Sequence, residues 1–153
     1  MGPRSDRLAA LGLLPSGGFG SRDRRTRTRY GLANHGGRII SVVDDDVSLR
    51  RSLRNLLSSV GFEVETFESA EAFLASDSRE RAACLVLDLR MPGMGGLDLL
   101  SHLAATGSRI PVIVLTAHGD DDARRRALDA GAVAFLIKPF QSAALLDAIQ
   151  RVV

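Results

Sequence analysis

The sequence is short of several residue types, and each shortage narrows the class of protein. Its 153 residues include a single cysteine, Cys84, so no disulfide can form within the chain. Cys84 lies in an apolar run, where a free cysteine behaves as a small buried hydrophobic residue of a reducing compartment, so a cytoplasmic location is expected. No apolar run approaches the roughly 18 residues that a membrane-spanning helix needs, and the first residues lack the layout of a signal peptide. We therefore expect neither a disulfide scaffold nor membrane insertion.

Lysine is almost absent as well. Of the 20 basic side chains 19 are Arg, and Lys138 is the only Lys. A GC-rich genome, which encodes most cations as Arg, would explain this shortage by itself. Alternatively, position 138 needs the compact ammonium of Lys, which a planar guanidinium cannot replace. The choice between these interpretations depends on which residues surround position 138.

Negative charge is scarce in the first part of the chain. Residues 1–37 carry seven Arg against Asp6 and Asp23, a net charge of +5, whereas residues 38–153 carry 13 basic and 16 acidic side chains, a net charge of −3. Paired glycines and an alternating Arg/Thr run give the first segment too little apolar surface to fold. We expect residues 1–37 to form a basic, disordered extension and residues 38–153 to form one domain. Nucleic-acid binding inferred from the basic pI would concern the extension and not the domain.

From residue 39 onward, apolar strand-like runs alternate with amphipathic helical segments. The expected strands are residues 39–43, 63–67, 84–87, 110–115 and 133–137. The expected helices are residues 47–60, 69–74, 97–103, 120–130 and a closing segment around 145–149. Such alternation predicts an α/β fold in which helices cover both faces of a parallel sheet. Glu63 and Glu65 place the second strand at an edge, whereas the other four strands suit central positions. Asp46 and Ser69 are expected at helix N-termini.

Four of these strands end on a chemically reactive side chain. Asp44 and Asp45, Asp88, Thr116 and Lys138 follow the first, third, fourth and fifth strands. Parallel strands bring these ends to one edge of the sheet. Clustered carboxylates favour a hard cation such as Mg²⁺, beside which Asp88 would stay ionised and could attack phosphorus. The cation, the Lys138 ammonium and the Thr116 hydroxyl could each bind one phosphoryl oxygen, which favours the functional interpretation of Lys138.

Four motifs in this order resemble the receiver (CheY-like) domain of two-component response regulators, most closely its FixJ-like group. The motifs are Val-Val-Asp-Asp-Asp at 42–46, Asp-Leu-Arg-Met-Pro-Gly-Met-Gly-Gly at 88–96, Thr-Ala-His-Gly at 116–119 and Gly-Ala-Val-Ala-Phe-Leu-Ile-Lys-Pro-Phe at 131–140. Each motif alone is a weak signal, but together they are highly specific. The resemblance covers residues 39–153, about three quarters of the chain. It implies a doubly wound, five-stranded parallel sheet of flavodoxin-like topology, built from alternating (βα)5 units.

The resemblance also implies a role for each matching residue of the acidic cluster. Asp88 matches the phosphoacceptor, which receives a phosphoryl group from a phosphohistidine on a sensor histidine kinase or a phosphotransfer protein. Asp44, Asp45, Asp88 and the backbone carbonyl of Arg90 match the ligands of Mg²⁺, for which Mn²⁺ is an acceptable substitute. Lys138 matches the ammonium that contacts the phosphoryl group, and the Lys138–Pro139 bond is expected to be cis.

In the same resemblance, Thr116 and Phe135 match the switch residues that move together on phosphorylation. The surface expected to respond is formed by the helix at 120–130, the strand at 133–137 and the closing helix, and phosphorylation-dependent homodimerisation through this surface is a further hypothesis. The chain is not expected to be an enzyme beyond its own phosphotransfer and autodephosphorylation.

Several alternatives remain open at this stage. The chain is expected to be either a stand-alone receiver or the receiver part of a FixJ-like transcription regulator without its DNA-binding domain. A small phosphoaspartate hydrolase of the haloacid-dehalogenase type would carry a second acid two residues after the nucleophile, where this chain has Arg90. A flavin-binding domain would need a hydroxyl- and glycine-rich loop after the first strand, where three acids would repel a phosphate.

Overall fold

A computed structural model describes residues 37–153 of the chain. The basic extension expected at residues 1–37 therefore lies, apart from Gly37, outside the described residues. Among the helices from residue 37 onward, none is both long and apolar enough to cross a membrane.

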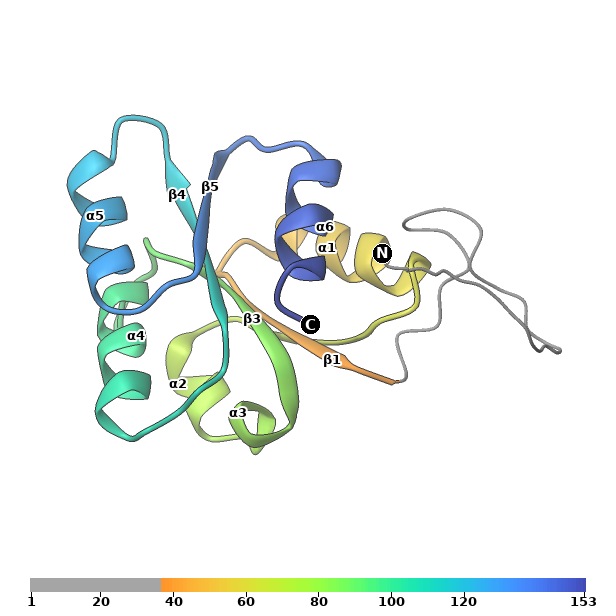
Figure 1. Cartoon of the computed structure of the whole chain (residues 1–153), viewed down its shortest axis with the longest axis horizontal. Coiled ribbons are helices and arrows are strands. Elements are labelled where there is room, and N and C mark those ends of the chain that lie inside the picture. The colour runs from red at the N-terminus through yellow and green to blue at the C-terminus, as the bar shows by residue number, and fades with distance from the viewer. Residues whose placement is uncertain (1–36) are drawn as a thin grey trace, which may run out of the picture.

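The described chain forms a single parallel sheet with helices between successive strands (Figure 1). The strands are β1 (Ile39–Val43), β2 (Glu63–Phe67), β3 (Ala82–Asp88), β4 (Val112–Ala117) and β5 (Ala134–Lys138). The helices are α1 (Val47–Ser59), α2 (Ala70–Leu74), α3 (Ser78–Arg81), α4 (Gly96–Ala105), α5 (Asp121–Asp129) and α6 (Ser142–Gln150). The strand order is β2-β1-β3-β4-β5, and every neighbouring pair is parallel. The predicted doubly wound, five-stranded sheet is confirmed.

Two hydrophobic clusters hold the helices on opposite faces of this sheet (Figure 1). On one face, Leu53 and Leu57 of α1 pack with the apolar side chains of α6 against β1, β3 and β4. On the other face, α2, α4 and α5 cover the alternate residues of the same strands, with Phe73 and Leu99 completely buried. Because β1, β3 and β4 are covered on both faces, they read as continuous apolar runs in the sequence.

The prediction of a central position was wrong for β5. β2 lies at one edge as expected, but β5 lies at the other edge, where only β4 pairs with it. An apolar run reports that helices cover both faces of a strand, and it says nothing about how many neighbours the strand has. The partial exposure of β5 fits this edge position, since none of its five residues is fully buried.

The short helix α3 was not predicted, because four residues are too few to show a helical period. Polar contacts hold it against the sheet instead. The hydroxyl of buried Ser78 lies 2.8 Å from that of Ser41 in β1, and Arg81 pairs with Asp77 at 2.9 Å and with Glu65 of β2. These bonds attach α3 to two neighbouring strands without an apolar face.

The predicted positions of Asp46 and Ser69 at helix N-termini are confirmed. The Asp46 side chain accepts hydrogen bonds from the N–H groups of Ser48 and Leu49, and Ser69 accepts from Ala72. Asp46 therefore caps α1, whereas the neighbouring Asp44 and Asp45 belong to the acidic cluster at the end of β1.

The loop after β3 approaches the sheet so closely at Gly96 that a side chain would not fit. A Cβ atom on Gly96 would lie 2.5 Å from the carbonyl oxygen of Asp88 and 2.6 Å from Cα of Leu89. Both atoms belong to the backbone, so neither can turn aside. The N–H of Gly96 donates to the Leu89 carbonyl over 3.1 Å, which fixes the loop beside Asp88.

We expect Gly96→Ala to lower the free energy of unfolding by about 1–3 kcal/mol, the usual cost of overpacking. The matched control is Gly95→Ala, because a Cβ on Gly95 would meet nothing nearer than 3.7 Å. Urea unfolding of the two variants measures the difference. Equal stability of the two variants would show that the loop moves freely away from Asp88.

Candidate functional site

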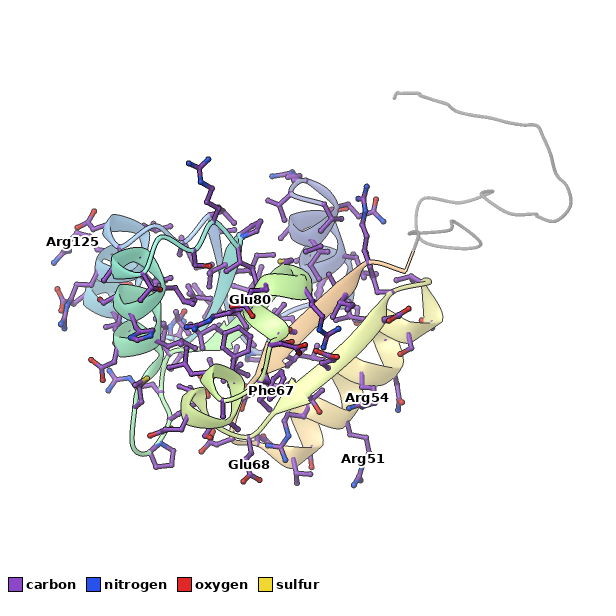
Figure 2. The ribbon with its side chains drawn as sticks, turned by 90° about the horizontal axis from the view of Figure 1, so that it is seen from below. Arg51, Arg54, Phe67, Glu68, Glu80 and Arg125 are labelled. Atoms are coloured by element: carbon purple, nitrogen blue, oxygen red, sulfur yellow. The ribbon has the colours of Figure 1, made fainter. Side chains whose placement is uncertain are left out.

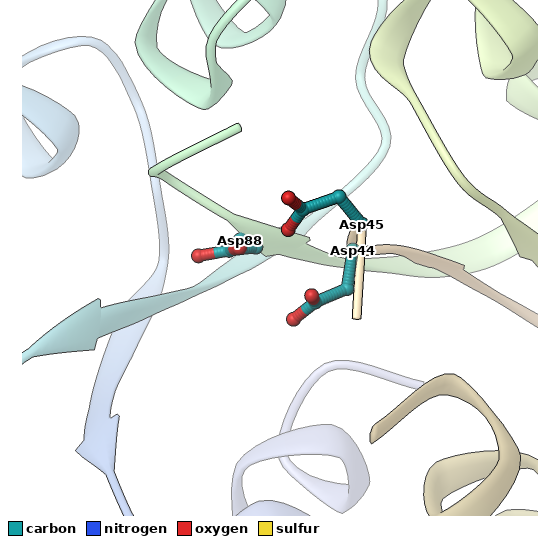
Figure 3. A group of neighbouring side chains, drawn as sticks. All are labelled: Asp44, Asp45 and Asp88. Carbon is teal, nitrogen blue, oxygen red and sulfur yellow. The ribbon is translucent and has the colours of Figure 1, made fainter. Parts of the chain in front are cut away.

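The acidic residues predicted from the sequence meet at the carboxyl-terminal edge of the sheet. Asp44 directly follows β1, and Asp88 is the last residue of β3. Asp44 and Asp88 are buried and Asp45 is exposed, and one carboxylate oxygen of each lies within 4.8 Å of the others. Figure 3 shows the three side chains grouped at the ends of these strands.

Lys138 brings positive charge into this cluster from the end of β5. Its Nζ lies 3.0 Å from Oδ2 of Asp44 and 3.5 Å from Oδ1 of Asp88. Burial by itself would lower the pKa of Lys138, but the hydrogen bonds and charges of the two aspartates outweigh burial and raise it above its ordinary value. The single Lys of the chain therefore lies on the acidic cluster as an ammonium ion. The peptide bond that follows it, Lys138–Pro139, is cis.

The surroundings of Asp88 oppose its ionisation. Asp88 is 5% exposed, and burial, followed by the charge of Asp44, raises its pKa from 3.8 to about 6. The N–H of Arg90 donates to Oδ1 of Asp88 over 3.2 Å, and this bond and Lys138 act in the opposite direction. One ammonium therefore only partly offsets the repulsion among the carboxylates.

This group of donors fits a hard divalent cation. Carboxylate oxygens are the ligands that Mg²⁺ prefers, and Mg²⁺ keeps several waters when it binds one or two carboxylates. The exposed Asp45 leaves one side of the cluster open to solvent, so a hydrated ion has access. A cation here would lower the pKa of Asp88 by direct charge attraction.

The two expected switch residues lie on adjacent strands, β4 and β5. Thr116 is 1% exposed, and its hydroxyl donates to the Leu136 carbonyl over 3.5 Å, a long and weak hydrogen bond. Phe135 is 38% exposed, and the guanidinium of Arg124 in α5 lies 5.4 Å from the centre of its ring. In this state the ring therefore faces outward, toward α5.

Sequence reasoning missed Asp120. Its carboxylate accepts two hydrogen bonds from the guanidinium of Arg90, from Nε over 2.8 Å and from Nη2 over 2.9 Å. This hydrogen-bonded pair lowers the pKa of Asp120 and raises that of Arg90. Another acid of the same segment does pair within α5, since Asp122 lies 3.8 Å from Arg126. Asp120 instead links the start of α5 to the loop that follows Asp88.

A groove of about 470 Å³ opens beside Lys138. Its lining combines α1 with the segment from Lys138 to the start of α6, and consists of Asp46, Leu49, Ser52, Leu53, Leu56, Lys138, Pro139, Phe140 and Ser142. An apolar surface thus lies next to the charged cluster.

The sequence and the fold resemble those of known proteins. Residues 40–150 match the response regulator receiver domain family. Nodulation protein W of Bradyrhizobium diazoefficiens is 50% identical over 111 residues, which are 72% of this chain and 49% of that protein. Transcriptional regulatory protein FixJ of Rhizobium meliloti is 45% identical over 112 residues, 73% of this chain and 55% of that protein. The chain thus spans about half the length of these curated relatives.

Solved structures agree with the sequence comparison. The crystal structure of FixJ-N superposes with a TM-score of 0.70 at 43% identity, and the match covers 75% of this chain and 92% of that one. The family match covers well over half of the chain and includes all the strands and helices of the described fold except Ile39, the first residue of β1. The chain therefore belongs to the receiver-domain family of two-component response regulators.

Proposed function

We propose that the chain is the phosphoacceptor of a two-component phosphorelay and that Asp88 receives the phosphoryl group. The observation that carries the proposal is the position of Asp88, which lies buried at the end of β3 against Asp44 and Lys138. Asp88 is buried enough to exclude most water and lies at an edge where the exposed Asp45 keeps the site open.

The chemistry proposed for Asp88 is nucleophilic attack. A carboxylate oxygen attacks the phosphorus of a phosphohistidine, the phosphorus–nitrogen bond breaks, and the imidazole leaves. Mg²⁺, when bound by Asp44, Asp45, Asp88 and the Arg90 carbonyl, supplies charge that keeps the nucleophile ionised and neutralises the phosphoryl oxygens; Mn²⁺ can take its place. Lys138 is already within 3.5 Å of Asp88 and is placed to contact a second phosphoryl oxygen.

Thr116 and Phe135 form the proposed switch. The weak bond of the Thr116 hydroxyl leaves it able to turn toward a phosphoryl group on Asp88. As Thr116 turns, the Phe135 ring is proposed to leave its outward position, and the surface formed by α5, β5 and α6 changes shape. We propose no catalytic activity for the chain beyond its own phosphotransfer and autodephosphorylation.

The proposed phosphodonor is a sensor histidine kinase or a phosphotransfer protein. The apolar groove between α1 and the start of α6 lies beside Lys138, where a partner helix could bind by its apolar face while it presents a phosphohistidine. Binding of nucleic acid by the receiver itself is not proposed, because residues 38–153 carry a net charge of −3.

The whole protein and its location are also matters for proposal. Because the curated relatives are about twice as long as the match, the receiver part of a FixJ-like regulator remains an alternative to a stand-alone receiver. The proposal of a cytoplasmic location rests on Cys84, which is a free and buried cysteine.

Incubation with acetyl phosphate and Mg²⁺ should add one phosphoryl group to the wild-type chain and none to Asp88→Asn, which lacks the nucleophile. Intact mass spectrometry measures the adduct, and chelation of Mg²⁺ should abolish it in the wild type. A phosphoryl adduct retained by Asp88→Asn would place the acceptor elsewhere.

The raised pKa of Asp88 predicts how stability depends on pH without a metal. A carboxyl group whose folded pKa is raised favours folding while it is protonated, so its ionisation costs stability as the pH rises from about 4 through about 6. In chelator at pH 8 we expect Asp88→Asn to be more stable than wild type by on the order of 3 kcal/mol. Thermal unfolding should show this difference shrink toward pH 4, and a constant difference would contradict the raised pKa.

Phosphorylation-dependent dimerisation is expected to use three exposed apolar side chains, which are Leu128 of α5, Val133 directly before β5 and Phe135 of β5. With Mg²⁺ and beryllofluoride, light scattering should report a dimer for the wild type. Val133→Asp should stay monomeric because dimerisation would bury the charge of the new carboxylate in the interface. Val47→Asp is the matched control, since Val47 is equally exposed, at 55% against 50%, but lies on α1. Loss of the dimer in both variants, or in neither, would contradict the proposed interface.

A further inference from the structure

Arg124 differs from the two arginines that follow it in α5. Its side chain is 16% exposed, whereas those of Arg125 and Arg126 are 68% and 65% exposed. Figure 2 shows Arg125 pointing away from the fold. Arginine is normally among the most exposed residue types, so the burial of Arg124 needs an explanation.

The guanidinium of Arg124 has an acceptor for one nitrogen and lacks one for another. Nη2 pairs with the carboxylate of Asp121, one turn earlier in α5. Nη1 is buried, and no hydrogen-bond partner meets it among the described residues. A buried donor without an acceptor is costly, and the group that faces this guanidinium is the ring of Phe135, 5.4 Å away at its centre. The electron-rich face of an aromatic ring attracts a cation.

We propose that Arg124 is a positioning residue that holds the Phe135 ring in its outward orientation and thereby stabilises the unphosphorylated state. This inference depends on the proposed switch at Thr116 and Phe135. When the ring leaves, the guanidinium of Arg124 loses the aromatic group that faces it, and α5 must adjust or expose the guanidinium. The contact therefore opposes switching, whereas the weak hydrogen bond of Thr116 opposes it little.

Removing the cation should make the switched state easier to reach. A phosphoryl mimic that binds only the switched state has an apparent dissociation constant inversely proportional to the fraction of protein in that state. Cation–π contacts at partly exposed sites are weak, so we expect Arg124→Gln to raise this fraction by about two- to fivefold. Glutamine keeps a good helix former and a hydrogen-bond donor at this position.

The experiment is a titration of the full chain with beryllofluoride at fixed Mg²⁺. The amide resonance of Thr116, observed by NMR, reports the fraction of protein in the switched state. Arg124→Gln should need about two- to fivefold less beryllofluoride for half-saturation than wild type. Arg125→Gln is the matched control: it removes an equal charge from the next residue of α5, whose partner is Asp122 at 2.6 Å, and should titrate like wild type. Arg124→Lys, which keeps a charge, should show a smaller decrease than Arg124→Gln.

A second pair of variants separates positioning from a general effect on helix α5. In a Phe135→Leu background there is no ring for Arg124 to hold, so adding Arg124→Gln should leave the half-saturating concentration unchanged. The same decrease in that background would overturn the proposal. Equal titrations of wild type and Arg124→Gln would also overturn it while leaving the function proposed for Asp88 intact, whereas a wild type that shows no response to beryllofluoride would overturn both.

Discussion

The structure depends on the balance of charge around Asp44. This carboxylate is completely buried, and a buried charge is tolerated only when it is paired. Its partner, Lys138, is 94 residues away and comes from the far edge of the sheet, so the ammonium reaches past β3 and β4 to meet it. One ammonium pairs with two of the three clustered carboxylates, those of Asp44 and Asp88. The remaining negative charge favours a cation at the site, as proposed, and burial together with the charge of Asp44 raises the pKa of Asp88.

The backbone around Asp88 is as constrained as the charges. Gly96 brings the start of α4 against the carbonyl of Asp88, at a separation that no other residue permits. The Arg90 N–H donates to the Asp88 carboxylate from the same loop. As the proposed nucleophile, Asp88 is held from both sides and would lose little freedom when it reacts. The same loop also carries the Arg90 carbonyl expected to bind the metal.

The alternation of strands and helices was predictable because burial on both faces of a parallel sheet leaves a continuous apolar signal. The ends of β1, β3, β4 and β5 were predictable for the same reason, and so was the meeting of Asp44, Asp88 and Lys138. Contacts that depend on where a side chain points could not be predicted from the sequence. The bond between Asp120 and Arg90 and the contact of Arg124 with the Phe135 ring leave no periodic pattern, since each joins residues that only the folded chain brings together. The edge position of β5 leaves no pattern either, because an apolar run does not report how many strands pair with it.

Helix α5 connects the loop after Asp88 with the Phe135 ring. Asp120, directly before it, holds the side chain of Arg90 from the loop after Asp88, and Arg124, one turn later, covers Phe135. A ligand shifts a two-state equilibrium only by its difference in affinity for the two states, so the free protein must favour one state without locking it. A cation–π contact of about 0.5–1 kcal/mol is suited to that purpose. In the proposed switch this contact biases the Phe135 ring outward, and a phosphoryl group that gained bonds to Thr116 and Lys138 would outweigh it.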